Sequence, residues 1–178
     1  MSFDDYDPDD DDPDYDDWDE DDPSDNPEVD AFWERYLASL PPGSRVPDTY
    51  AAWGFGDGPE MADELGALVY QGVKTASCGL LFEYKAEGEP LPKVGDLSVI
   101  TAGDGTPLCI IETTEVTVQP FNTVDAQFAY DEGEGDRSYD FWRAAHWRFF
   151  SRVCAELGCE ISETMPVVCE RFRVVYRA

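Results

Sequence analysis

The negative charge of this chain is concentrated at its N-terminal end, which confines the folded part to the rest of the sequence. Residues 1–30 carry 17 of the 40 acidic residues and none of the 12 Lys and Arg residues. A segment of Asp, Pro and a few aromatic residues buries too little apolar surface to offset the entropy lost on ordering. We therefore expect a disordered acidic tail over residues 1–27 and a single folded domain over residues 28–178.

Two helices are predicted in the first part of this domain. Residues 26–40 begin with Asn-Pro-Glu, which suits a helix start, and continue with an apolar stripe at helical spacing. Residues 57–72 begin with Asp-Gly-Pro-Glu and end at Gly72, a residue suited to the left-handed turn that ends many helices. The residues that follow Gly72 are therefore expected to lie in a loop.

That loop carries Lys74, Thr75 and Ser77. A lysine is ordinary at the negative end of a helix dipole, and hydroxyl residues are ordinary in turns. Binding and catalytic sites also combine an amine with neighbouring hydroxyl groups. The residues alone leave both interpretations open.

After Pro92 the hydrophobic period changes from that of a helix to that of a strand. Residues 96–101 and 108–118 are rich in Ile, Val and Thr and flank a Gly-containing turn, so they predict a hairpin. A long helix over 138–157 and a strand over 167–176 follow. Strands outside βαβ alternation predict an α+β fold with a largely antiparallel sheet.

Several short motifs occur in one order and together resemble the ASCH domain family, a branch of the PUA-like superfamily, over residues 30–177. They are Phe55-Gly56-Asp57, Gly72-Val73-Lys74-Thr75-Ala76-Ser77, Leu91-Pro92-Lys93-Val94-Gly95-Asp96, Glu132-Gly133-Glu134-Gly135-Asp136 before Trp142 and His146, and Val168-Cys169-Glu170-Arg171-Phe172. The resemblance implies a small, partly open PUA-like β-barrel flanked by helices. It also implies recognition of RNA or nucleotides. Some relatives are hydrolases that deacylate N4-acetylcytidine or cleave RNA.

Carried over residue by residue, the resemblance places the family's Gly-x-Lys loop on Gly72 and Lys74. The hydroxyl of the deacylating relatives falls on Ser77, where they have threonine, and their acidic residue falls on Glu112. An arginine often follows that hydroxyl two positions later, whereas Gly79 stands here. The resemblance thus gives a candidate catalytic set and a candidate substrate-binding set. The first is Lys74, Ser77 and Glu112; the second includes Phe55, Asp57 and Thr75.

Glu112 interrupts an apolar strand, and a carboxylate pointing into a barrel needs a partner. The residues alone leave open that it points outward as a solvated strand residue, but the resemblance favours the inward orientation, for which we expect the Lys74 ammonium within about 6 Å of the Glu112 carboxylate. With a lowered pKa, Lys74 could take the proton of Ser77, as an amidohydrolase requires. As a cation it would instead bind phosphate or stabilise negative charge, as RNA binding or cleavage requires.

Four arginines lie within residues 136–152, which carry only one acid after Asp136. Arginine beside aromatic rings suits contact with phosphates and bases. The alternative is that these arginines pair with surface acids while the aromatic residues form core. On the first interpretation the substrate-binding residues include Arg137, Arg143, His146 and Arg148.

No cofactor is expected. The five cysteines lack metal-ligand spacing and suit free thiols in a reducing cytoplasm. Glu132 and Glu134 lie in a Gly-rich turn and could bind a divalent cation or cap the following helix. No apolar run reaches the ~20 residues of a membrane span, and no signal peptide is recognised, so we expect a cytoplasmic protein without a membrane partner.

The predicted function is recognition of RNA or a nucleoside or nucleotide, with ribonuclease-like hydrolysis. One alternative is an amidohydrolase acting on N4-acetylcytidine-type nucleosides, and another is a non-catalytic RNA-binding module. The acidic tail is either a solubilising segment or a mimic of a nucleic-acid strand.

Overall fold

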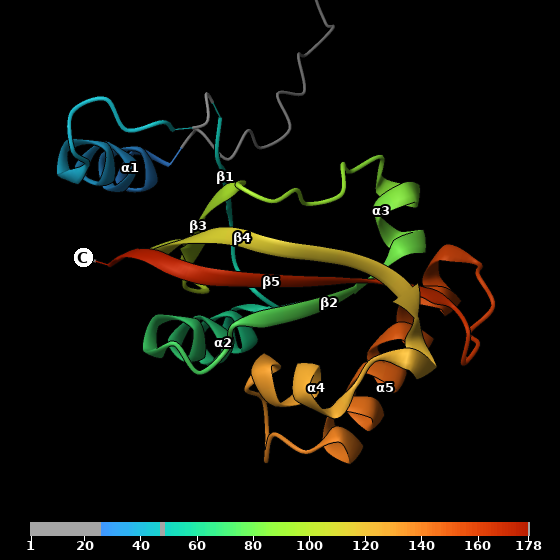
Figure 1. The fold of residues 1–178 in the computed structure, drawn as a ribbon. Helices are drawn as coiled ribbons and strands as arrows, with labels where there is room; N and C mark the ends of the chain where they lie inside the picture. The colour runs from blue at the N-terminus through green and yellow to red at the C-terminus, as the bar shows by residue number, and fades with distance from the viewer. Residues whose placement is uncertain (1–25, 47–48, 178) are drawn as a thin grey trace, which may run out of the picture.

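The computed structural model describes residues 26–46 and 49–177, and the expected acidic tail lies almost entirely outside this range. Within these residues, five strands form one curled sheet, a half-barrel, in the order β1-β3-β4-β5-β2 (Figure 1). Their bounds are β1 Ala51–Trp53, β2 Ala76–Leu80, β3 Leu97–Thr101, β4 Pro107–Pro120 and β5 Pro166–Arg177. Only β1 and β3 pair in parallel; the other three pairs are antiparallel.

The helices α1 (Pro27–Ser39) and α2 (Pro59–Gln71) pack against opposite faces of the β3–β4 hairpin. Strand residues alternate between faces, so Val99 and Ile110 join the cluster under α1, whereas Ile100 and Cys109 join the cluster under α2. All four are fully buried. The hairpin is therefore covered on both sides, which explains its near-continuous apolar sequence.

The remaining helices surround the other end of the sheet. They are α3 (Leu81–Glu87), α4 (Ala126–Glu132) and α5 (Tyr139–Leu157), with a short 3-10 turn at Phe121–Thr123. Helices α4 and α5 lie together beside the β2 end of the sheet (Figure 1), where Phe121 stacks on Trp142. This cluster forms the second half of the core.

The α+β class and the partly open barrel are confirmed. The predicted helices correspond to α1, α2 and α5, and the predicted hairpin is β3–β4. One local prediction is wrong, because Ser77 lies on strand β2 and not in a loop. The sequence Ala-Ser-Cys-Gly-Leu has little strand propensity of its own; its pairing with β5 makes it a strand. In the described part of the chain, no helix is long and apolar enough to span a membrane.

Candidate functional site

The β2–β5 pair separates two groups of polar side chains. Ser77 lies directly opposite Glu170 in the antiparallel register, and Cys78 lies directly opposite Cys169. Because neighbouring strand residues point to opposite faces, the Ser77–Glu170 pair faces one side of the sheet and the Cys78–Cys169 pair faces the other. The first side opens into a cleft, and the second holds a buried ion cluster.

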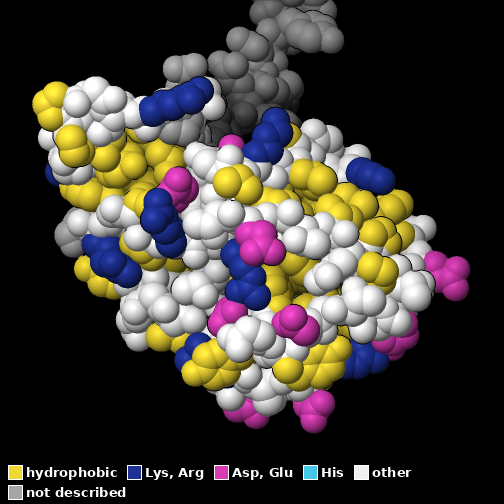
Figure 2. Space-filling model, viewed as in Figure 1, with side chains coloured by type: hydrophobic (Ala, Val, Ile, Leu, Met, Phe, Trp, Pro, Cys, Tyr) yellow, Lys and Arg dark blue, Asp and Glu magenta, His cyan; other side chains and the backbone are white. Residues whose placement is uncertain are grey.

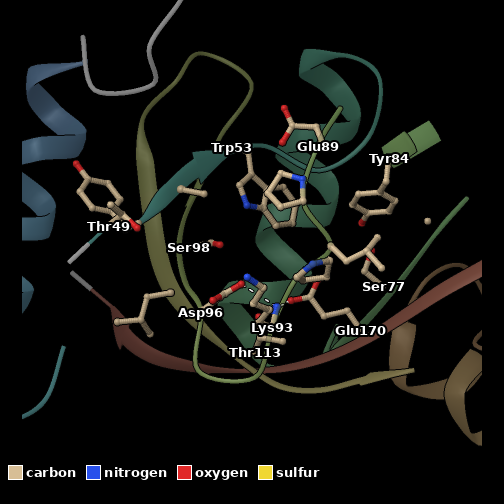
Figure 3. Close-up of a pocket in the computed structure, with 17 residues that line it drawn as sticks. Thr49, Trp53, Ser77, Tyr84, Glu89, Lys93, Asp96, Ser98, Thr113 and Glu170 are labelled. Atoms are coloured by element: carbon tan, nitrogen blue, oxygen red, sulfur yellow. Dashed lines mark hydrogen bonds between the residues drawn. The ribbon is translucent and has the colours of Figure 1, made fainter. Parts of the chain in front are cut away.

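The cleft has a volume of about 550 Å³, within the range usual for small-ligand sites. It is lined by residues of all five strands, by Tyr84 of α3 and by the segment 89–96. In the view of Figure 3 the rings of Trp53 and Tyr84 lie above the polar side chains of Asp96, Thr113 and Glu170. The cleft thus combines an aromatic side with a polar side.

Glu170 is the half-buried carboxylate of the cleft. Its Oε1 accepts a hydrogen bond of 2.5 Å from the Thr113 hydroxyl. Burial raises the pKa of Glu170, and the nearby Asp96 carboxylate raises it further, against the lowering effect of the Thr113 hydrogen bond. Glu170 is therefore more basic than an exposed glutamate and suits proton transfer or recognition of a donor.

Tyr84 projects over β2 because Gly79 has no side chain. A Cβ at Gly79 would lie 2.9 Å from Cε2 of Tyr84, closer than van der Waals contact allows. The glycine that stands where the resemblance suggested arginine thus makes room for an aromatic ring. Burial raises the pKa of Tyr84 to about 12, with a further contribution from Glu170, so the ring remains a neutral phenol.

On the other side of the sheet, Lys74 is buried with only 1% of its side chain exposed. Its Nζ lies 3.0 Å from Oε2 of Glu132 and 2.7 Å from Oε1 of Glu134, and 5.3 Å from the centre of the Phe55 ring. Burial by itself lowers the pKa of Lys74, but the two carboxylates outweigh burial and the net change is upward. Lys74 is therefore a structural cation and not a free amine.

His146 and Trp142 complete this cluster around Glu132. Trp142 Nε1 donates to Glu132 Oε1 at 2.8 Å, and His146 Nε2 lies 3.3 Å from the same oxygen. His146 Nδ1 lies 3.0 Å from the Trp142 carbonyl oxygen, which can only accept, so Nδ1 carries a proton. Nε2 can then donate to Glu132 only if the ring is an imidazolium.

The resulting cluster is balanced in charge. Burial lowers the pKa of His146, but Glu132 raises it more, which favours the imidazolium. Burial likewise opposes ionisation of Glu132, yet Lys74 and His146 lower the pKa of Glu132 to about 2. Two cations, Lys74 and His146, thus face two anions, Glu132 and Glu134.

One group in the described residues has ligand atoms close enough for a metal ion. The donor atoms of Cys78, Glu132 and His146 lie within 4.8 Å of one another. The carboxylate and the imidazole are already engaged by Lys74, by Trp142 and by each other. We therefore assign this group to the ion cluster.

The predicted pairing of Lys74 with Glu112 is wrong. Glu112 on β4 pairs instead with Arg173 on β5. Its Oε2 accepts hydrogen bonds from Arg173 Nε at 2.8 Å and from Arg173 Nη2 at 2.6 Å. Of the candidate catalytic set, only Ser77 lines the cleft. The physical reason is that Glu132 at the end of α4 and Glu134 in the Gly-rich turn after it both reach Lys74, which leaves no role there for Glu112.

The candidate substrate-binding residues do not gather around the cleft either. Three contact other parts of the fold: Thr75 donates to the Asp131 carbonyl at 3.2 Å, Phe55 packs beside Lys74, and Asp57 pairs with Arg152. His146 belongs to the ion cluster. The arginines lie elsewhere: Arg137 stacks on Tyr130, Arg143 pairs with Glu163, and Arg148 lines a shallow hollow beside Arg143.

The alternative interpretation of these arginines, as partners of surface acids, fits Arg143 and Arg152. Figure 2 shows Lys and Arg side chains distributed singly among acidic and apolar ones on the face in view, and no continuous basic patch on that face.

Sequence reasoning missed Trp53, Tyr84, Thr113 and Glu170 as lining residues. Glu170 could have been found, since it lies inside the last family motif and interrupts an apolar strand as Glu112 does. Nothing local distinguishes Trp53 or Tyr84 from core aromatics.

The chain matches the family model of the ASCH domain over residues 51–176. It is 41% identical to an ASCH domain of known structure from Lactobacillus crispatus JV V101, with a TM-score of 0.80 over 84% of this chain and 95% of that one. It is 39% identical to protein EF3133 from Enterococcus faecalis V583, with a TM-score of 0.73 over 83% of this chain and 88% of that one. None of the curated proteins matches it. The family match and the shared fold together place this chain in the ASCH domain family.

Proposed function

We propose that the cleft binds a single nucleobase, presented by a single-stranded RNA or by a free nucleoside. ASCH domains are generally thought to bind RNA, and this supports the class of ligand. The observation that carries the proposal is the pairing of the Trp53 ring with the Thr113–Glu170 hydrogen bond in one cleft.

A nucleobase is flat and apolar on its faces and polar along its edge. Proteins that read unpaired bases stack them on aromatic rings and bind their edges through side-chain hydrogen bonds. Trp53 and Tyr84 supply rings, while Ser77, Thr113 and Glu170 supply donors and acceptors. The volume of about 550 Å³ holds one nucleoside.

The charge of the chain favours base contacts over phosphate contacts. Sequence-independent RNA binding rests on Lys and Arg, and its affinity falls steeply with salt. In the part of the chain that the structure describes, the only cationic side chain that lines the cleft belongs to Lys93. Binding should therefore depend on stacking, be limited to unpaired bases and be of moderate affinity.

Replacement of Trp53 by Leu should weaken binding of a single-stranded RNA hexamer about tenfold, because stacking on an aromatic ring contributes about 1–3 kcal/mol per base. The measurement is the fluorescence anisotropy of a labelled hexamer titrated with the full chain. Phe82→Leu is the matched control, since Phe82 is an exposed aromatic on α3 that does not line the cleft. Equal affinities of wild type and Trp53→Leu would contradict the proposal.

A second candidate function is hydrolysis of an acylated nucleoside. The observation in its favour is the register of Ser77 and Glu170, which sets a hydroxyl opposite a carboxylate of raised pKa. Such a pair suits a nucleophile and a general base. The catalytic residues predicted from the sequence for an amidohydrolase and for a ribonuclease both included Lys74. In the structure Lys74 is engaged in the ion cluster. No arginine is among the described residues that line the cleft, which makes RNA cleavage the weaker alternative.

If this second function holds, N4-acetylcytidine should lose its acetyl group, and Ser77→Ala should slow the release at least ~100-fold. Ser39→Ala is the control, because Ser39 lies at the end of α1 and bonds only its own helix. Release of acetate at the wild-type rate by Ser77→Ala would remove Ser77 from the reaction. No release by the wild-type protein would leave base recognition as the function of the cleft.

A further inference from the structure

The charged side chains that line the cleft are mostly acidic. Among the described residues, Glu89, Asp96 and Glu170 contribute carboxylates, and Lys93 contributes the only ammonium group. With all four ionised, the lining carries two net negative charges. A cleft of this sign disfavours a phosphate and favours a neutral or positively charged ligand.

Glu170 lacks a cationic partner among the described residues. Its hydrogen-bond partner is the neutral Thr113 hydroxyl, and the residue opposite it on β2 is the neutral Ser77. No Lys or Arg of the described chain forms an ion pair with it, and the charged group that affects its pKa is another carboxylate, Asp96. A half-buried carboxylate without a counter-charge is stabilised when a cation arrives beside it.

The aromatic side of the cleft attracts the same kind of ligand. The negative faces of indole and phenol rings bind cations, with tryptophan the strongest. Trp53 and Tyr84 both line the cleft, and in the view of Figure 3 they lie across from Glu170. A flat cation between ring and carboxylate would satisfy both at once.

We propose that the cleft prefers positively charged nucleobases, such as bases methylated on a ring nitrogen, over neutral ones. This preference rests on the proposed function, because it assumes that the cleft takes a base. It names the ligand more narrowly: a delocalised cation that stacks on Trp53 and faces Glu170. Phosphates of the same strand would lie outside the cleft, away from its acidic lining.

The test compares three nucleosides by isothermal titration calorimetry with the full chain at pH 7. In 1-methyladenosine the base carries a positive charge, whereas N6-methyladenosine has the same methyl group and no charge; adenosine is the unmodified reference. We expect 1-methyladenosine to bind about tenfold more tightly than N6-methyladenosine, because the contact with the aromatic rings and the charge of Glu170 both favour the cationic base. Choline serves as a cation without a base.

Two variants show whether Glu170 causes the preference. Glu170→Gln keeps the size of the side chain but removes its charge, so it should reduce the tenfold ratio to about threefold or less. Glu64→Gln, an exposed change on α2, should keep the wild-type ratio.

The possible outcomes separate this inference from the proposed function. If neutral and charged nucleosides bind equally well, the preference is overturned and base recognition stands. If choline binds and none of the nucleosides does, base recognition fails and the preference for charged bases fails with it, because the cleft then takes a cation but not a base. If none of the four ligands binds, both are overturned. A ratio that survives in Glu170→Gln would overturn the role of Glu170.

Discussion

Replacement of Lys74 by Met should lower the free energy of unfolding by about 3–5 kcal/mol, the cost of breaking a buried ion pair by removing one partner. The variant leaves Glu132 and Glu134 without their cation, and Glu132 is only 1% exposed. A lysine on an exposed loop would be replaceable without such a loss. Lys74 is not, because the end of α4 and the turn after it place two carboxylates beside it.

Urea unfolding followed by tryptophan fluorescence measures this loss. Lys85→Met is the matched control, since Lys85 is exposed at the end of α3. The double variant Lys74→Met/Glu132→Gln should be more stable than the sum of the two single effects predicts, because the second change removes the uncompensated charge. A loss below about 1 kcal/mol in Lys74→Met would contradict the role of the cluster in folding.

Stability should be greatest between about pH 4.5 and 6.5 because the ion cluster weakens on both sides of this range. The pKa of Glu132 is about 2 in the folded chain against an ordinary value of 4.5. Its contribution is therefore present above pH 4.5 and is lost as the pH falls toward 2; the difference corresponds to about 3 kcal/mol. The pKa of His146 is raised above its ordinary 6.5, so its contribution is present below that value and is lost as the pH rises through the raised pKa.

The free energy of unfolding measured from pH 2 to 9 tests this dependence. Glu132→Gln should flatten the acidic side of the profile, and His146→Gln should flatten the alkaline side. Glu64→Gln should reproduce the wild-type shape, which separates the cluster from the general effect of the many other acids. An acidic side as steep in Glu132→Gln as in the wild type would show that other carboxylates cause the acid transition.

Local signals were sufficient to predict much of the fold. Asn26 caps α1 by accepting from the Glu28 amide, and Gly72 ends α2 with a φ of 76°. The change of period after Pro92 identified the β3–β4 hairpin. Strand β2 was not predicted, because its five residues have no strand pattern of their own and depend on long-range pairing with β5.

The candidate site was harder to predict because its parts are distant in the sequence. Trp53 and Glu170 are more than 100 positions apart, and curling of the sheet brings them to one cleft. Glu112 was the expected partner of Lys74, but the fold of the chain around the end of α4 brings Glu132 and Glu134 there instead. The charge of a side chain is known from the sequence, whereas the residue that pairs with it in the fold is not.

The two-sided arrangement of β2 and β5 has a consequence for how this domain can diverge. Ser77 and Glu170 face the cleft, while Ala76 and Cys169 beside them belong to the core. Under the proposed function, mutations at the first kind of position would change what is bound with little effect on folding, and mutations at the second kind would do the reverse. A family member could therefore change its ligand through substitutions at alternate residues of β2 and β5. The same spacing offers protein engineers positions that can be randomised in a library without loss of the scaffold.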